Sequence, residues 1–297
     1  MNEHAPLQIG VIGIGVMGLP IAAHLRDTGF AITVHDIRDE AMVAAAEDGL
    51  QTAASPASLA AAMDVLIVIV VDAAQIDVVL FGAGGVIHHA PRNDRQPLIV
   101  LLCSTIAPDD VARFARRLAE YGIETIDAPV SGGPVRARSG SISMMLAAPE
   151  QTLEHAAAIT AAMADKRFVI STHIGDAARV KLVNNLLAGA NLVAAAEAMA
   201  LGTQLGLNTQ TLFDVISQSS GASWIFSDRM VRTLHDDFVP RAALTLLTKD
   251  LTLACTMAQS IAQPTPVADA ALAVFKQAVA SDLGALDDAA VIKAYFK

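Results

Sequence analysis

The sequence predicts an α/β fold in which a doubly wound parallel sheet is followed by an all-helical second domain. From residue 8 to residue 130, short β-branched or aliphatic runs alternate with alanine-rich amphipathic stretches, a pattern typical of parallel strands joined by helices. After about residue 174 the β-branched runs stop, and long apolar segments of helical period take over. The domain boundary is therefore expected at this point, which divides the chain into residues 1–174 and 175–297.

The strands expected in the first domain are the aliphatic and β-branched runs at residues 8–13, 31–35, 65–70, 98–102, 124–126, 143–146 and 167–171. The amphipathic stretches predict helices over residues 16–28, 39–48, 56–62, 74–80, 108–121 and 149–164. In the second domain a long helix over residues 178–205, which serves both domains, is followed by helices over 209–217, 226–234, 244–262, 265–280 and 289–295.

Composition excludes several classes of partner. The chain has 297 residues, of which 54% are hydrophobic and 17% charged, enough apolar material for two cores. Its 20 Lys and Arg against 30 Asp and Glu give a net charge of −10, so we expect no nucleic-acid partner and no anionic membrane surface. The eight histidines show no paired ligand spacing, and no metal site is expected.

Hydropathy and cysteine usage predict a cytoplasmic protein. The mean hydropathy is +0.48, but the longest unbroken apolar run, residues 65–71, is far shorter than the roughly 20 residues that span a bilayer. The apolar stretch at residues 7–23 is preceded by Glu3 and by no basic residue, unlike a signal sequence. The two cysteines, Cys103 and Cys255, lie far apart, as expected in a reducing compartment.

A glycine pattern after the first strand predicts a dinucleotide site. Gly13 permits a tight turn, Gly15 lets a pyrophosphate approach the backbone, and Gly18 lets helix and strand pack closely. The N-terminus of the next helix then presents unpaired N–H groups and its positive dipole end to the phosphates. A plain tight turn remains the alternative. The predicted turn also contains Ile14, Val16 and Met17.

Asp36 follows the second strand, where a carboxylate can accept hydrogen bonds from an adenosine ribose and would repel a 2′-phosphate. This position favours NAD over NADP. Arg38 lies two residues later and could reach a phosphate, so NADP stays possible. The alternative is that Asp36 only caps a turn.

Two further segments carry groups suited to a small hydroxy acid. Residues 127–133, Asp-Ala-Pro-Val-Ser-Gly-Gly, form a small-residue loop whose N–H groups and Ser131 hydroxyl can bind an anion, although such a loop is often only a turn. Lys181, Asn184 and Asn185 share one face of an apolar helix, where idle polar groups would be costly to bury. Asparagines can hold a substrate hydroxyl and carboxylate while a lysine exchanges the proton that accompanies hydride transfer. A solvated helix face is the alternative.

Taken in order, five motifs resemble those of the β-hydroxyacid dehydrogenase family, which includes 3-hydroxyisobutyrate dehydrogenase and tartronate semialdehyde reductase. The resemblance covers nearly the whole chain. The motifs are the glycine loop with Met17, Ser104-Thr105 with Pro108 after the fourth strand, residues 127–133, Lys181 to Asn185, and Lys249-Asp250. One departure from the family pattern is Ala177, where a second glycine usually follows Gly175, which puts the local loop geometry in doubt.

The resemblance implies a Rossmann-type domain that binds NAD(P), a helical domain for substrate and oligomerisation, and a homodimer or homotetramer. By the resemblance Lys181 is the catalytic acid/base, and the substrate is bound by Ser131, Gly132, Gly133, Asn184 and Asn185. The cofactor is contacted by Val71, Ser104, Thr105 and Lys249, with Thr105 and Lys249 at the nicotinamide end.

The substrate branch is expected to be a threonate-like sugar acid or a 3-hydroxyisobutyrate-like acid, because residues 219–229 resemble the L-threonate dehydrogenase branch. Oxidation with decarboxylation is not expected, since Asn184 and Ala188 stand where 6-phosphogluconate dehydrogenases carry histidine and glutamate. Imine reductases typically replace the lysine, so Lys181 favours alcohol chemistry. Two alternatives stay open. One is an NAD(P)H-dependent reductase of tartronate, glyoxylate or succinic semialdehyde, and the other is an NAD-binding regulatory protein without turnover.

Overall fold

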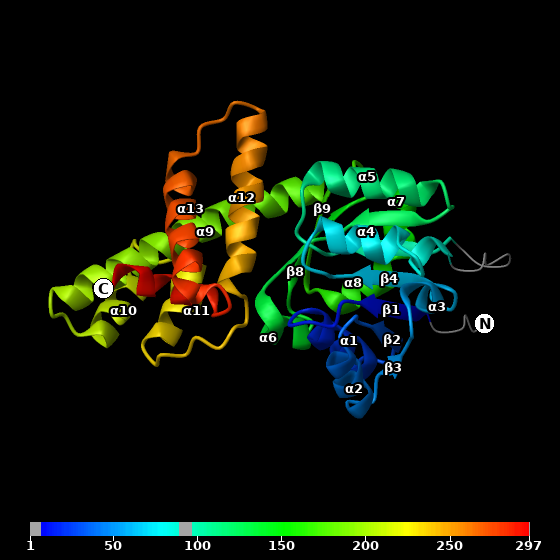
Figure 1. The fold of residues 1–297 in the computed structure, drawn as a ribbon, viewed down its shortest axis with the longest axis horizontal. Coiled ribbons are helices and arrows are strands. Elements are labelled where there is room, and N and C mark those ends of the chain that lie inside the picture. The colour runs from blue at the N-terminus through cyan, green and yellow to red at the C-terminus, as the bar shows by residue number, and fades with distance from the viewer. Residues whose placement is uncertain (1–6, 89–96, 297) are drawn as a thin grey trace. The chain divides into compact units, whose positions relative to one another are not determined.

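The computed structural model describes residues 7–88 and 97–296 and contains two compact units, one ending at Lys181 and one beginning at Leu182 (Figure 1). The first unit is built around a sheet flanked by helices and the second from helices alone, as the sequence predicts. The division lies inside one long helix, whereas the predicted boundary at residue 174 precedes that helix.

The sheet of the first unit is parallel over most of its width. Its strand order is β3-β2-β1-β4-β5-β6-β8-β7, and β9 pairs with β8. Neighbours from β3 to β6 are parallel, while β8 is antiparallel to β6 and β7. The strands are β1 (Gln8–Ile12), β2 (Ala31–His35), β3 (Gln51–Thr52), β4 (Val65–Val68), β5 (Ile99–Leu102), β6 (Glu124–Asp127), β7 (Val130–Ser131), β8 (Ser143–Ala147) and β9 (Lys166–Ser171).

The central strands are buried on both faces. Ile9 and Val11 of β1 belong to one apolar cluster, and Ile12 belongs to another on the opposite face. The same alternation separates Val65 from Leu66 in β4, because successive side chains of a strand point to opposite faces. Helices must therefore cover both sides of the sheet, which is the doubly wound arrangement predicted from the continuous apolar runs.

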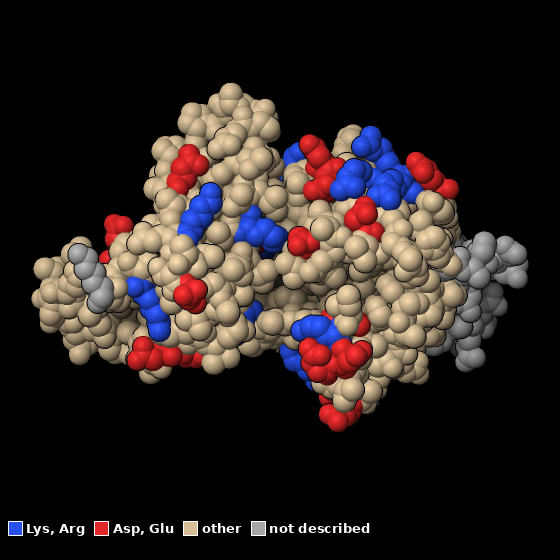
Figure 2. Space-filling model, in the orientation of Figure 1, with Lys and Arg blue, Asp and Glu red and all other residues tan. Residues whose placement is uncertain are grey.

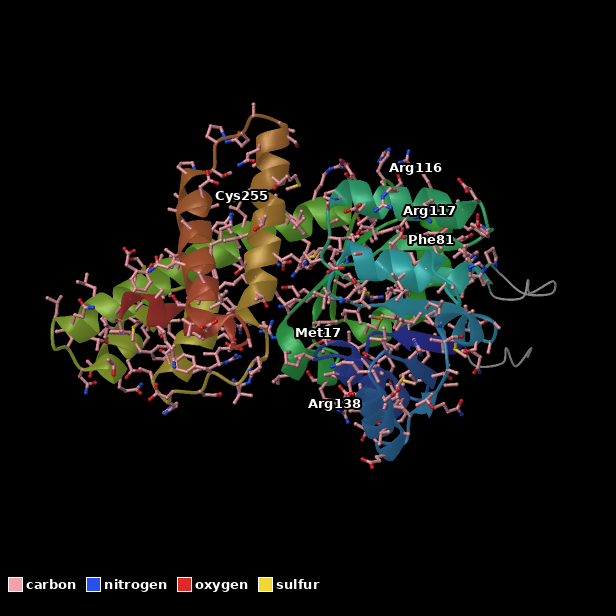
Figure 3. All side chains as sticks on the ribbon, viewed as in Figure 1. Met17, Phe81, Arg116, Arg117, Arg138 and Cys255 are labelled. Atoms are coloured by element: carbon pink, nitrogen blue, oxygen red, sulfur yellow. The ribbon has the colours of Figure 1, made fainter. Side chains whose placement is uncertain are left out.

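The helices of the first unit are α1 (Gly18–Asp27), α2 (Asp39–Glu47), α3 (Pro56–Ala60), α4 (Ala73–Phe81), η1 (Val86–His88), α5 (Pro108–Ala119), α6 (Gly133–Arg138), α7 (Glu150–His155) and α8 (Ala157–Met163). On the outer side of α5, Arg117 stacks over the ring of Phe81, 3.5 Å from its centroid (Figure 3). Arg117 and Arg113 also pair with Asp77, so acidic groups accompany the arginines that gather over α5 (Figure 2).

The second unit packs its helices around an apolar core. The helices are α9 (Asp176–Gln204), α10 (Thr209–Ser217), α11 (Trp224–Thr233), α12 (Leu244–Ser260), α13 (Pro266–Ala278), the π-helical turn η2 (Val279–Leu283) and the 3₁₀ helix η3 (Asp288–Tyr295). Leu251 of α12 lies so close to Gly189 of α9 that a Cβ there would be 2.2 Å from its Cδ1. The glycine therefore allows the two helices to approach.

Helix α9 is, among the residues described, the one helix long and apolar enough to cross a membrane. Half of its most apolar 18-residue window is buried inside the structure, which is the behaviour of a core helix. Length and composition thus give only weak support for a membrane span.

Several element predictions need correction. The single helix expected over residues 149–164 is two helices, because Ala156, fully buried in the core, leaves helical geometry with φ −93° and ψ 4°. Strands β3 and β7 and helix α6 were missed, since each is too short for a hydrophobic period to register. The sheet is also not wholly parallel, as β8 runs against β6 and β7.

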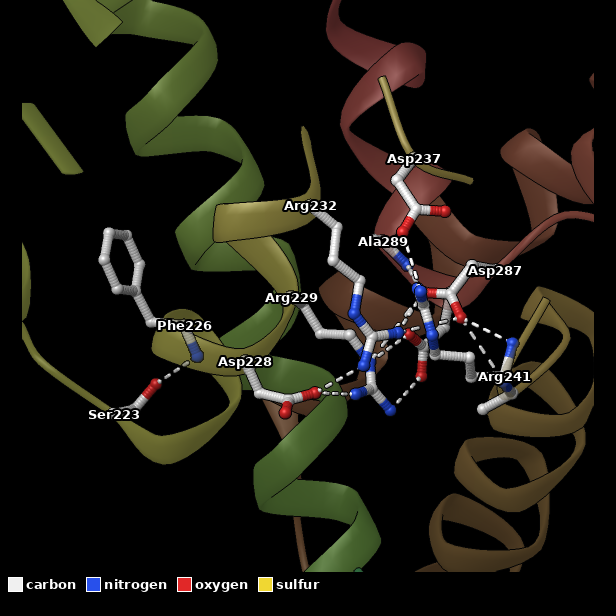
Figure 4. A network of polar contacts seen from close by, with 11 residues as sticks. Ser223, Phe226, Asp228, Arg229, Arg232, Asp237, Arg241, Asp287 and Ala289 are labelled. Atoms are coloured by element: carbon white, nitrogen blue, oxygen red, sulfur yellow. Dashed lines mark hydrogen bonds and ion pairs between the residues drawn. The ribbon is translucent and has the colours of Figure 1, made fainter. Parts of the chain in front are cut away.

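A buried ion-pair network fixes the end of the chain to α11 (Figure 4). Asp287 is fully buried and accepts hydrogen bonds from the N–H groups of Arg241, Ala242 and Ala289, and it pairs with Arg232. Its neighbour Asp288, whose pKa burial raises to about 6, pairs with Arg229.

We expect Asp287→Ala to lower the free energy of unfolding by about 3–5 kcal/mol, because it leaves a guanidinium and several N–H groups buried without their acceptor. Urea unfolding followed by circular dichroism measures this. The exposed Asp214 of α10 provides a matched control, and Asp214→Ala should change stability by no more than about 0.5 kcal/mol. Equal effects of the two substitutions would contradict the role given to the network.

Candidate active site

The predicted cofactor residues of the first unit lie at the carboxyl edge of the parallel strands, whereas Lys249 belongs to α12 of the second unit. The order β2-β1-β4 places the topological switch point between β1 and β4, where open α/β sheets bind ligands. The glycine turn follows β1, Asp36 follows β2, Val71 follows β4, and Ser104 and Thr105 follow β5. The Ser104 hydroxyl accepts a hydrogen bond from the Val70 N–H at 2.9 Å and so joins the ends of two neighbouring strands.

The glycine turn has the shape that a pyrophosphate needs. Gly13 has a φ of +91°, and a Cβ on Gly18 would lie 1.9 Å from the Gly13 carbonyl oxygen, so both positions require glycine. A Cβ on Gly15 would meet nothing nearer than an Arg38 nitrogen at 4.0 Å. The backbone is therefore bare on the side where phosphates would approach the N-terminus of α1, just after Met17 (Figure 3).

Asp36 contacts both the turn and Arg38. Its carboxylate accepts hydrogen bonds from the Ile14 N–H at 2.9 Å and from Arg38 Nε and Nη2 at 2.9 and 3.0 Å. Burial alone would raise the pKa of Asp36, but the hydrogen bonds from Arg38 and Ile14 outweigh it and hold the pKa below its usual range. Asp36 thus holds the turn in place, and the Arg38 side chain occupies an acceptor site on each of its two oxygens.

The segment from Asp127 to Gly133 links three short elements. Ser131 ends β7 and pairs with Ser143 of β8. Gly132 and Gly133 have φ values of +137° and +75°, which favour glycine, and α6 begins at Gly133. The loop is therefore a strand-to-helix turn of small residues, with the Arg136 side chain against Gly132.

Asp127, at the end of β6, was missed as a separate contributor. It is 1% exposed, and one of its oxygens, Oδ2, accepts hydrogen bonds from the N–H groups of Gly175 at 2.9 Å and Ala178 at 3.0 Å. Burial raises the pKa of this carboxyl to about 6, against the hydrogen bonds that lower it. The carboxylate caps α9, the helix that carries Lys181.

Ala177, in place of the glycine usual at this position, does not disturb a loop. It lies in the first turn of α9, fully buried against Met145 and Ala147 of β8. Gly175 occupies the position that favours glycine, because its φ is +105° and a Cβ there would lie 3.1 Å from the Pro108 carbonyl oxygen.

Helix α9 carries the predicted catalytic and substrate residues. Lys181 and Asn185 are both buried and stand four positions apart, one turn along the same side of the helix, while Asn184 is exposed. A buried lysine is uncommon, because an ammonium group loses hydration unless the protein compensates it.

In the second unit a chain of hydrogen bonds orders the polar side chains. Asn184 Nδ2 donates to Asn185 Oδ1 at 3.1 Å, and Asn185 Nδ2 donates to Asp250 Oδ2 at 2.7 Å. Lys249 Nζ donates to the other Asp250 oxygen at 2.8 Å. Asp250 therefore orients two predicted site residues at once. The sequence reasoning named its motif but gave it no role.

Cys103 directly follows β5 and is buried in the core of the first unit. Burial, with a smaller contribution from the charge of Asp127, raises the pKa of its thiol to about 12. Since the thiolate is the reactive form, Cys103 is an inert core residue at neutral pH.

Comparison with known proteins identifies both halves of the chain. Residues 8–175 match the family described as the NAD binding domain of 6-phosphogluconate dehydrogenase. Residues 175–295 match the family described as NAD-binding of NADP-dependent 3-hydroxyisobutyrate dehydrogenase.

Similar individual proteins carry two different names. L-threonate dehydrogenase from Cupriavidus necator is 39% identical over 287 residues, covering 97% of this chain and 95% of the relative. L-threonate dehydrogenase from Escherichia coli is 34% identical over 296 residues, covering 99% and 97%. A crystal structure described as 3-hydroxyisobutyrate dehydrogenase from Salmonella typhimurium has a TM-score of 0.89 and 34% identity, and the match covers 97% of this chain and 99% of that one.

We expect Gly15→Ala to weaken NAD binding by about tenfold or more, the ratio that 1.4 kcal/mol gives, while leaving the melting temperature unchanged. The added methyl group has room in the protein but occupies the side where phosphates approach. Titration of the variant with NADH, followed by fluorescence, measures the affinity. Undiminished binding would favour a plain tight turn.

Proposed function

Because the chain belongs to the β-hydroxyacid dehydrogenase family and is an NAD(P)-dependent hydroxyacid dehydrogenase, we propose that it oxidises a threonate-like sugar acid, with Lys181 as general acid/base. The observation that carries the proposal is the buried Lys181, one turn from Asn185 on α9. The names of the L-threonate dehydrogenases similar to this chain support the substrate class.

The chain's own groups suit each part of the reaction. Lys181 accepts the proton of the substrate hydroxyl as the carbon loses hydride, and returns it in the reverse direction. When bound, the nicotinamide accepts the hydride. Ser131 and the N–H groups of Gly132 and Gly133 bind the substrate carboxylate, because their loop presents donors without bulky side chains.

Asn185 holds the substrate hydroxyl or a neighbouring one, and its amide has a defined orientation. Since Nδ2 donates to Asp250, the amide cannot rotate without breaking a 2.7 Å hydrogen bond to a buried carboxylate. Asp250 also restrains Lys249, which we assign to the nicotinamide end of the cofactor together with Thr105.

For the cofactor we propose a preference for NAD. Asp36 would repel the 2′-phosphate of NADP, and it offers a ribose two oxygens once Arg38 turns away. Arg38 is half-exposed, so this rotation needs no repacking of the core. The same arginine could bind a 2′-phosphate, which makes NADP the second choice.

The second candidate function is reduction of a semialdehyde by the same residues working in reverse. A similar crystal structure is described as 3-hydroxyisobutyrate dehydrogenase, which makes a smaller hydroxy acid an alternative substrate. We further propose a homodimer or homotetramer in the cytoplasm, which size-exclusion chromatography with light scattering and cell fractionation would test.

We expect L-threonate to give the highest kcat/KM in a panel that includes 3-hydroxyisobutyrate, glycerate and 3-hydroxypropionate, with NAD preferred to NADP. Initial rates of cofactor reduction at alkaline pH measure this. The reverse reaction with tartronate, glyoxylate and succinic semialdehyde provides the comparison. Faster turnover of 3-hydroxyisobutyrate would overturn the substrate class while leaving the reaction type intact.

We expect Lys181→Ala to lower kcat by about 10²–10⁴-fold, the usual contribution of a general acid or base, with NADH affinity unchanged. The exposed Lys166 of β9 provides a matched control, and Lys166→Ala should keep full activity. Full activity of the Lys181 variant would contradict the assigned role. No turnover of any substrate by the wild-type protein, with NAD still bound, would favour the regulatory alternative.

A further inference from the structure

Asp127 stands between the two segments to which the proposed function assigns the chemistry. It is the last residue of β6, four residues before Ser131, and its side chain reaches the start of α9. One oxygen accepts hydrogen bonds from both Gly175 and Ala178, which flank the first turn of that helix. All of these residues belong to the first unit.

Helix geometry carries this restraint to the lysine. Lys181 is three residues after Ala178, about 4.5 Å along the axis at 1.5 Å per residue, and so lies one turn beyond the capped amide. Ala177 packs on Met145 and Ala147, which also restrains this turn. A shift of the first turn therefore moves the Lys181 backbone with it.

Asp127 caps α9 with a carboxylate, although a neutral side chain could accept the same hydrogen bonds. A neutral Ser, Thr or Asn can cap a helix, and it avoids the cost of burying a charge. Within the described part of the chain, the second oxygen, Oδ1, is buried and has no hydrogen-bond partner. Because Oδ1 accepts no hydrogen bond, the negative charge acts mainly by strengthening the two hydrogen bonds that Oδ2 accepts from the N–H groups of Gly175 and Ala178.

We propose that Asp127 is a positioning residue for the reaction, whose charged carboxylate locks the first turn of α9 to the end of β6 and thereby sets Lys181 against the Ser131 loop. The inference rests on the proposed role of Lys181. Asp127 touches neither substrate nor cofactor in this account, and it acts through the helix.

The pH dependence of kcat distinguishes a positioning role of Asp127 from that of a purely structural cap. Of the groups around Asp127, Asp176 adds to the elevation of its pKa to about 6, and Cys103 remains a neutral thiol. Because the pKa rises above its ordinary value of 3.8 on folding, this group's contribution to stability is full below 3.8 and is lost as the pH rises through 6. The proposed contribution to kcat has the opposite trend and is lost as the pH falls through 6.

The experiment compares Asp127→Asn, which keeps the shape and an acceptor oxygen but removes the charge, with Asp127→Ala, which removes the cap. We expect kcat of the alanine variant to fall by about 10²-fold, the cost of a misplacement of roughly 1 Å, with NADH affinity unchanged. The asparagine variant should lose less, and its kcat should lack the inflection near pH 6 that we expect in the wild-type profile.

Ser55→Ala is the matched control, because Ser55 caps α3 through the Ser58 N–H and lies in no predicted site. It should lower the melting temperature and leave kcat and its pH profile unchanged. If the Asp127 variants behave like this control, the positioning role is wrong. If the alanine variant does not fold, the test is the pH dependence of kcat of the asparagine variant. The inference would be overturned if that dependence were the same as in the wild-type protein.

Lys181→Ala separates this inference from the proposed function. An inactive Lys181 variant together with a fully active Asp127→Ala variant would refute only the positioning role. An active Lys181 variant would refute the proposed chemistry itself, whatever the Asp127 variants do.

Discussion

Burial of the central strands on both faces is the constraint on which the rest of the structure depends. Because β1, β4 and β5 are covered by helices on each side, their polar backbone is accessible mainly where the strands end. The parallel pairing brings those ends to one edge, so the glycine turn, Asp36 and Ser104 meet although they are far apart in the sequence. The edge is therefore a consequence of core packing.

Buried or half-buried carboxylates then set the local geometry at each part of the candidate site. Asp36 holds the glycine turn through the Ile14 N–H, and Asp127 holds the start of α9. Asp250 orients Asn185 and Lys249, while Asp287 organises the end of the chain through contacts outside the predicted site. In each case the cost of burying a charge is offset by N–H donors, and the result is a fixed backbone or side-chain orientation.

The fold and most of the predicted site residues could be read from the sequence, because their signals are local. Continuous apolar runs indicate strands buried on both faces, and Gly13, Gly15 and Gly18 have separate steric reasons to be glycine. Prediction failed for elements too short to show a hydrophobic period and for features that depend on tertiary packing. Helix 149–164 breaks at the buried Ala156, and β7 has only two residues. Asp127 and Asp250 were named within motifs, but Asp127 binds Gly175, 48 positions away, and Asp250 binds Asn185, 65 positions away.

The sequence by itself predicted the doubly wound sheet followed by helices, and it named candidate residues for dinucleotide binding and proton transfer. These follow from periodicity, glycine spacing and residue chemistry, which act over one or two turns of chain, while the resemblance of five motifs in order indicated the family. Only the tertiary structure decided that Arg38 occupies the oxygens of Asp36, that Ala177 lies within α9, and that Asp127 caps the helix of Lys181. The contacts of Ala177 and Asp127 depend on which strand ends meet, and that is set by the packing of the whole sheet. Arg38 and Asp36 are only two positions apart, and their pairing depends on the side-chain geometry after β2.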